Sequence, residues 1–140
     1  MGRAAYNGRL MIEFHLDARS GVATYLQIVQ QVKEALRLGL LDVGDQLPTV
    51  REVVADLAIN PNTVAKAYRD LERDGLVVAR PGRGTFVAST LATPSLEHHE
   101  ALRRELETWL AQARQAGLDE ESIRALISKT LREALVRQVA

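Results

Sequence analysis

The chain has 140 residues, of which 46% are hydrophobic and 26% are charged, a balance typical of a folded, water-soluble domain. It contains no cysteine, which excludes disulfide bonds and thiolate metal sites. No apolar run reaches the roughly 20 residues that span a bilayer, and the first ten residues lack the apolar segment of a secretory signal. We therefore expect a cytoplasmic protein with no membrane partner. The formal net charge is zero, so positive charge for a nucleic-acid partner has to be local.

Residues 1–21 are predicted to form an N-terminal arm ahead of the folded part of the chain. Residues 1–10 are polar and glycine-containing and show no periodicity, whereas Met11 begins a segment that is typical of a natural start. Residues 1–10 are therefore either non-native residues ahead of a mis-assigned start or a native disordered arm, and both interpretations stay open.

A first helix is predicted between residues 23 and 41. Its apolar residues recur at helical spacing, at Leu26, Ile28, Val29, Val32, Leu36 and Leu40. Gly39 lies just past the periodic stretch, where helices commonly end. The segment 42–48 that follows is rich in turn-forming residues, so we predict a loop there.

A second, short helix is predicted after Thr49 and ends near Leu57. The Thr49 side chain is suited to cap its first turn, and Glu52 is placed to return a bond to the Thr49 amide, which makes a capping box. The predicted buried stripe consists of Val50, Val53, Val54 and Leu57. A tight turn through residues 58–60 follows.

A third helix is predicted from residue 61 to residue 74, directly after that turn. Asn60 is a favourable N-cap, and Pro61 suits the first helical position, where a missing amide hydrogen has no cost. The buried residues of this helix are predicted to be Val64, Ala67, Tyr68 and Leu71. Gly75 is predicted to close it.

Two short β-branched runs, residues 76–80 and 85–89, flank a Pro-Gly-Arg-Gly turn and predict a β-hairpin. The order of helix, short helix, tight turn, helix and hairpin is that of a winged helix-turn-helix. We therefore predict an α+β, mostly helical fold, with a winged helix-turn-helix DNA-binding domain over residues 22–89.

Residues 90–140 are predicted to form a helical dimerisation domain. Two apolar stripes at helical spacing, separated by Gly117, indicate two helices, and Asp119 is suited to cap the second. A two-helix tail of this size does not bury both stripes by itself, so a partner copy is the simplest cover. The predicted interface residues are Leu102, Leu106, Trp109, Leu110, Ile123, Leu126, Ile127, Leu131 and Leu135. The alternative for Trp109 is packing against the first helix of its own chain.

A resemblance to the DNA-binding domain of the GntR family is carried by the stretch LPTVREVVADLAINPNTVAKAYRDLERDGLVVARPGRGTFV, with YLQIVQQVKEAL before it. The match covers residues 22–88, and the short helical tail resembles that of the YtrA-type subfamily in particular. The resemblance implies a homodimeric regulator, a repressor or an activator, that binds an inverted-repeat DNA operator; we predict a repressor. The sequence departs from the family pattern at Ala65, where serine or arginine is common, which puts one base or phosphate contact in doubt.

The third predicted helix is expected to enter the major groove of DNA with its N-terminus first. The side chains predicted to meet base edges and phosphates are Pro61, Asn62, Thr63, Lys66 and Arg69. Asn62 suits adenine or a phosphate, and Thr63 suits a thymine methyl or a phosphate. The alternatives are a solvated helix start for Asn62 and Thr63, and, for one of the two basic residues, an ordinary ion pair with Asp70 or with an acidic neighbour of Arg73.

Arg51, in the first turn of the second helix, matches a DNA-contacting arginine of the family pattern and ranks first among the predicted contacts. An arginine there is able to form two bonds to guanine or to a phosphate. The alternative is a surface ion pair with Glu52 or Asp56. Thr49, which precedes this helix, is also predicted to contact DNA.

The tip of the predicted hairpin is expected to lie against the duplex. The residues predicted to contact DNA there are Arg80, Gly82, Arg83 and Gly84. Glycines allow close approach of the backbone, and an arginine is able to enter a narrow minor groove. The alternative is a Pro-Gly turn that binds no ligand.

No catalytic or metal-binding pattern stands out in the sequence. His98 and His99 are adjacent, so on a helix they point about 100° apart, which suits no shared metal, and the third histidine is His15. We predict no metal, no cofactor and no enzyme activity, because the motifs for nucleophilic catalysis and for phosphate or dinucleotide binding are missing. An unidentified small-molecule effector stays open. The competing function is a winged-helix module for protein–protein interaction without DNA binding.

Overall fold

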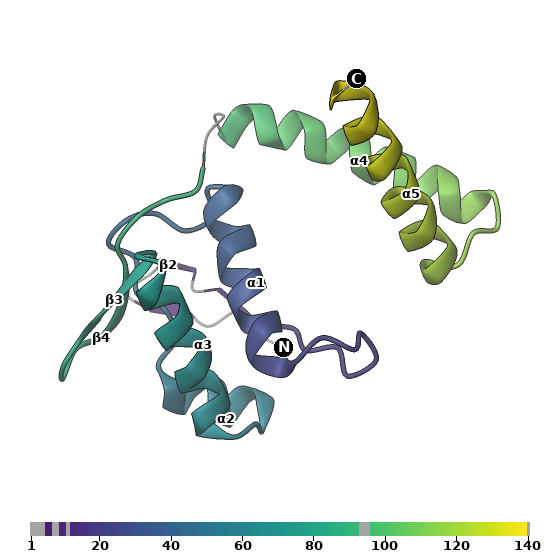
Figure 1. The fold of residues 1–140 in the computed structure, drawn as a ribbon. Coiled ribbons are helices and arrows are strands. Elements are labelled where there is room, and N and C mark those ends of the chain that lie inside the picture. Colours follow the sequence, from purple (N-terminus) through teal and green to yellow (C-terminus); the bar gives the residue numbers. More distant parts are fainter. Residues whose placement is uncertain (1–4, 7–8, 11, 93–95, 140) are drawn as a thin grey trace. The chain divides into compact units, whose positions relative to one another are not determined.

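The computed structural model describes residues 5–6, 9–10, 12–92 and 96–139, which divide into two compact units (Figure 1). The first unit covers residues 1–96 and the second covers residues 97–140. The elements of the first unit are β1 (Ala5–Tyr6), β2 (Arg9–Leu10), α1 (Thr24–Arg37), α2 (Val50–Leu57), α3 (Pro61–Arg73), β3 (Val77–Arg80) and β4 (Gly84–Val87). Two long helices follow, α4 (Leu96–Gln115) and α5 (Glu120–Val139).

The first unit has the predicted winged helix-turn-helix fold, in which α1 packs on α3, α2 packs on α3, and the β3–β4 hairpin completes the core. The largest fully buried side chains come from α1, the loop before α2, α3 and β3: Ile28, Val32, Leu36, Leu47, Val64, Leu71 and Val77. The α+β, mostly helical fold class is therefore confirmed.

The segment before α1 is part of this core, although residues 1–21 were predicted to be an arm. Phe14 is buried. Gln27 of α1 accepts from the Asp17 amide at 2.8 Å and donates to the Asp17 carbonyl at 3.0 Å. Gln31, one turn later, makes the same pair of bonds to His15, at 2.9 and 2.6 Å. Hydrophobic periodicity does not reveal side-chain amides that pair with a backbone, so the predicted boundary at residue 22 lies inside the unit.

Two segments of the predicted N-terminal arm are β1 and β2, which pair in antiparallel register, with Ala5 opposite Leu10. The rest of residues 1–11 lies outside the described residues, so the two interpretations of residues 1–10 stay as they were.

Helix α1 ends at Arg37, two residues before the predicted stop at Gly39. Gly39 closes it, with bonds from the Gly39 amide to the Leu36 carbonyl at 3.3 Å and from the Leu40 amide to the Ala35 carbonyl at 2.9 Å. The chain therefore leaves the helix before Leu40, which is 64% exposed rather than buried as predicted. Leu26, at the start of the predicted stripe, is also exposed.

The cap of α2 is close to the prediction but differs in one bond. The Thr49 hydroxyl accepts from the Glu52 amide at 3.1 Å, as a capping box requires. The Glu52 carboxylate accepts from that same hydroxyl, also at 3.1 Å, instead of from the Thr49 amide. The helix ends in Ala58, whose φ of +53° is a conformation that alanine rarely adopts.

Residues 44–47 belong to the loop that was predicted, and they make backbone hydrogen bonds to β4 through an isolated bridge. The Leu47 amide donates to the Thr85 carbonyl at 2.9 Å, and the Val87 amide donates to the Asp45 carbonyl at 2.8 Å. Gln46 stands opposite Phe86. The partner lies about forty residues along the chain, so local turn propensity predicted the loop correctly but did not indicate this pairing.

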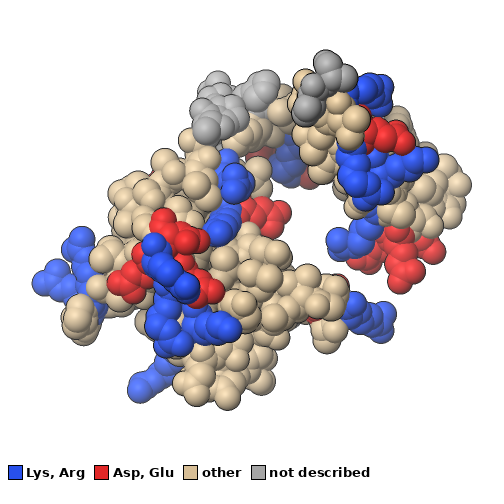
Figure 2. Space-filling model, viewed as in Figure 1, with Lys and Arg blue, Asp and Glu red and all other residues tan. Residues whose placement is uncertain are grey.

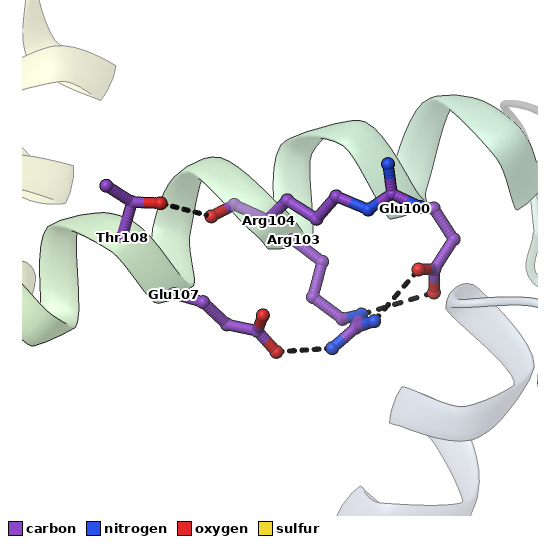
Figure 3. A network of polar contacts seen from close by, with 5 residues as sticks. All are labelled: Glu100, Arg103, Arg104, Glu107 and Thr108. Carbon is purple, nitrogen blue, oxygen red and sulfur yellow. Dashed lines mark hydrogen bonds and ion pairs between the residues drawn. The ribbon is translucent and has the colours of Figure 1, made fainter.

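The second unit contains the two helices predicted for the tail. Helix α4 ends ahead of Gly117, and Asp119 caps α5 by accepting from the Ser122 amide at 2.8 Å. Hydrogen bonds from the side chain and from the backbone amide of Ser122 hold the pKa of the Asp119 carboxyl below its usual value. On α4, Arg103 forms ion pairs with Glu100 and Glu107 (Figure 3).

Most of the predicted interface residues of this tail are exposed within one copy of the chain. Leu106 is 50% exposed and Leu131 is 57% exposed, whereas Trp109 and Leu110 are half-buried. Of the predicted set, Ile123 is buried. One copy therefore leaves an apolar face on both helices.

Replacing Tyr68 with phenylalanine is expected to destabilise the first unit by about 1–3 kcal/mol, because a buried carbonyl loses its donor. Tyr68 is buried, and its hydroxyl donates to the Pro48 carbonyl at 2.5 Å. Burial raises the pKa of this phenol well above its usual value. Urea unfolding measures the change. Tyr25→Phe is the control, since the Tyr25 hydroxyl makes no hydrogen bond within the described residues; equal stability of Tyr68→Phe and wild type would contradict the prediction.

Candidate nucleic-acid interface

The first turn of α3 is capped in a way that leaves its outer side chains available. Asn60 is the N-cap and accepts from the Asn62 amide at 2.8 Å, and Pro61 occupies the first helical position, as predicted. The Asn62 side chain is exposed and makes no hydrogen bond within the described residues. Thr63 is half-buried. This helix end therefore presents polar groups to the outside.

The exposed face of α3 brings together three of the predicted contact residues. Asn62, Lys66 and Arg69 follow each other at spacings of four and three residues and are all exposed. The opposite face is buried and consists of Val64, Ala67, Tyr68 and Leu71, as predicted. Arg73 is also exposed and lies four residues after Arg69, so it continues this row. Helical periodicity alone would have predicted this.

The predicted alternative for Lys66 and Arg69, an ion pair with Asp70, does not form. Asp70 pairs with Arg73 instead. Arg69 has no ion-pair partner among the described residues. The charge of Lys66 lies over the ring of Tyr25 from α1, 3.9 Å from the ring centre. Nothing in the sequence indicated this contact, because the two residues are brought together only by the packing of α1 on α3.

Arg51 is exposed in the first turn of α2 and forms no ion pair within the described part of the chain. The alternative of a surface ion pair with Glu52 or Asp56 is therefore not observed. Thr49, two residues earlier, is half-buried, and its hydroxyl both accepts and donates within the cap. Its contact with DNA stays a prediction, while its role at the helix start is visible.

The hairpin tip carries two exposed arginines. The Arg83 amide donates to the Arg80 carbonyl at 2.9 Å across Pro81 and Gly82, and φ of Gly82 is +75°, as the third position of a type II turn requires. The Arg80 guanidinium lies 5.6 Å from the ring centre of Phe86. Blue side chains mark this tip in Figure 2.

Gly84, predicted to allow approach to DNA, is needed inside the protein itself. A Cβ atom on this residue would lie 2.5 Å from Nε2 of Gln46, and φ of Gly84 is +126°. Gln46 was not singled out in the sequence, because its pairing with β4 was not predicted. A DNA contact by Gly84 stays a prediction.

The charges of the first unit are mixed, in keeping with the net charge of zero, and Figure 2 shows blue and red side chains together over α3. The acidic residues of α3 and its C-cap lie at the C-terminal end, where Asp70 pairs with Arg73 and Asp74 pairs with Lys33 of α1 at 3.3 Å. The N-terminal half of α3 carries Lys66 and no acidic residue. Positive potential is thus local to the helix start and the hairpin tip.

Neither a metal cluster nor a membrane span is found in the described residues. No three His, Asp or Glu side chains among them are grouped closely enough to hold a metal ion. No described helix combines the length and the apolar character needed to cross a bilayer.

The chain is similar to bacterial regulators over most of its length. The family model "Bacterial regulatory proteins, gntR family" matches residues 24–87. The HTH-type transcriptional repressor YtrA of Bacillus subtilis is 37% identical over 115 residues, covering 81% of this chain and 88% of that protein. YhcF, an uncharacterized HTH-type transcriptional regulator of the same organism, is 35% identical over 105 residues, covering 75% and 87% of the two chains. The crystal structure of a transcriptional antiterminator from Listeria monocytogenes aligns with a TM-score of 0.54 and 32% identity, over 85% of this chain and 90% of that one.

Proposed function

Because the chain belongs to the GntR family of bacterial regulatory proteins, we propose that it binds a specific DNA operator as a homodimer and represses transcription. The observation that carries this proposal is the exposed face of α3, where Asn62, Lys66 and Arg69 stand on the same compact unit as the arginines of the hairpin tip. The repressor assignment is supported by similarity to YtrA of Bacillus subtilis, which is named a transcriptional repressor.

In the proposed complex, the N-terminal half of α3 lies in the major groove. Asn62 reads a base edge or binds a phosphate, and Lys66 and Arg69 bind phosphates on either side. Arg51 of α2 forks to a guanine or to a phosphate. The hairpin lies over the adjacent minor groove, where an arginine from its tip enters.

The second unit is proposed to supply the dimer contact. Each copy exposes an apolar face on α4 and α5, which includes Leu106 and Leu131. A two-fold partner that covers this face would hold two DNA-binding units on an inverted-repeat operator. A small effector, if one acts on this protein, would change the spacing or angle between those two units. The named relatives are transcriptional regulators, and we propose no catalytic activity and no cofactor.

Selection of genomic DNA fragments by the purified full-length protein tests this function. The retained fragments are expected to share an inverted repeat. With Lys66, Arg69 and one tip arginine on phosphates in each subunit, affinity is expected to fall by about a thousandfold between 50 and 200 mM salt. Fluorescence anisotropy with a labelled operator measures this loss. A folded protein that binds no duplex even at low salt would overturn the proposal and would favour the protein–protein interaction module.

A further inference from the structure

The backbone pairing between the segment before α2 and the hairpin is short. Gln46 stands opposite Phe86, and the Leu47 amide makes the last backbone bond, to the Thr85 carbonyl. Pro48, the next residue, lies at a position of this register whose N–H would point away from β4, and α2 begins two residues later at Val50. In this antiparallel register, Pro48 would pair with Gly84, at the base of the hairpin tip. The ladder therefore stops before it reaches the tip.

The side chain of Gln46 continues this contact beyond the end of the ladder. Its Nε2 donates to the Arg83 carbonyl at 3.1 Å, in the turn itself. Gly84 leaves room for the side-chain amide of Gln46, because a Cβ atom on residue 84 would lie 2.5 Å from its Nε2. The tip of the hairpin is thus bonded to a residue that stands three positions ahead of the α2 cap.

The same face of the hairpin also holds the second tip arginine. Phe86, the residue opposite Gln46, lies on the same face of β4 as Gly84. The guanidinium of Arg80 is 5.6 Å from its ring centre. The other face of the hairpin, with Val77 and Val87, is buried in the core. Both tip arginines are therefore held on the outer face. The Arg80 guanidinium lies near the Phe86 ring, and the Arg83 carbonyl accepts from the Gln46 side chain.

We propose that Gln46 is a positioning residue of the DNA interface, which fixes the tip arginine Arg83 at a set distance from the start of α2. The inference rests on the proposed DNA-binding function. A protein that uses two neighbouring grooves needs a fixed spacing between the parts that enter them, and a loose tip would lose conformational freedom on binding. Gln46 ties the tip to the segment that leads directly into Thr49 and Arg51.

The substitution Gln46→Met tests this proposal, since it keeps the length of the side chain and removes the donor. Operator binding is expected to weaken by about threefold to tenfold, the effect of one hydrogen bond. In an Arg83→Ala background the same substitution is expected to change affinity by less than about twofold, because its effect passes through Arg83. The matched control is Gln30→Met, on the exposed side of α1, where the amide makes no hydrogen bond within the described residues.

Equal losses from Gln46→Met in both backgrounds would show a general structural role and would overturn the inference, as would unchanged binding. Hydrogen exchange of the free protein gives a readout that needs no DNA. The Arg83 amide is expected to exchange faster in Gln46→Met, while the Val87 amide keeps its protection because its bond to Asp45 is a backbone bond. Unchanged exchange at Arg83 would also overturn the inference. Failure of the wild type to bind any duplex would contradict the proposed function instead and would leave this exchange test intact.

Discussion

An Arg51→Ala dimer is expected to bind its operator more weakly by about 2–6 kcal/mol, since an arginine that forks to a guanine contributes about 1–3 kcal/mol and the dimer carries two. In affinity this is about thirtyfold to twenty-thousandfold. The structure supports a large effect because Arg51 is exposed and makes no ion pair within the described residues. Its backbone is held in the first turn of a capped helix, so the guanidinium starts from a defined position.

Fluorescence anisotropy at one salt concentration measures the loss, with urea unfolding to verify that stability is unchanged. Arg51→Lys distinguishes the two kinds of contact, because lysine keeps a phosphate contact but does not form the two parallel bonds to guanine. The matched control is Arg37→Ala, an exposed arginine in the last turn of α1. Full affinity and unchanged specificity of Arg51→Ala would remove this residue from the interface.

Leu131→Asp is expected to convert the dimer to monomers and to weaken operator binding by about a hundredfold to ten-thousandfold, because two linked half-site contacts become two separate ones. Leu131 is 57% exposed in one copy and belongs to the apolar face of α5. A carboxylate in a buried apolar contact loses its hydration without gaining a partner. The expected loss is in the coupling between half-sites, so the affinity for a single half-site stays as it was.

Sedimentation velocity measures the oligomeric state of this variant, and anisotropy with complete and half-site operators measures the two affinities. Leu40→Asp is the control, since Leu40 is an equally exposed leucine outside the tail. A Leu131→Asp protein that remains dimeric would place the dimer contact elsewhere and would require a different cover for the tail.

Features that depend on neighbouring residues were predictable from the sequence. The Asn60 cap, Pro61 at the helix start and the glycines that follow α1 and α3 were identified correctly, because caps and helix ends are determined within one or two turns. The hairpin and its turn were predicted for the same reason. The winged helix fold then followed from the order of these elements.

Features that depend on distant pairing were not predictable in this way. The loop segment 44–47 has turn-forming composition and pairs with β4 only through the tertiary fold. Gln46 became visible as a contact of the hairpin tip only once that pairing was known. The position of Lys66 over Tyr25 likewise results from the packing of α1 on α3, which periodicity does not encode. The exposed row on α3 was predicted in part, since Arg73, which pairs with Asp70, was not among the predicted contacts.

The paired amide contacts of α1 have a consequence for which sequence changes this fold tolerates. Gln27 and Gln31 bind the backbone of Asp17 and His15 with both the oxygen and the nitrogen of their side chains. Glutamate would supply only acceptors and lysine only donors, so neither replaces these glutamines. The exposed imidazole of His15 takes no part in this pairing, so a substitution of His15 has little effect on the stability of the fold. Substitution is therefore restricted at Gln27 and Gln31 of α1. At His15, whose backbone alone makes these bonds, the side chain is free to vary.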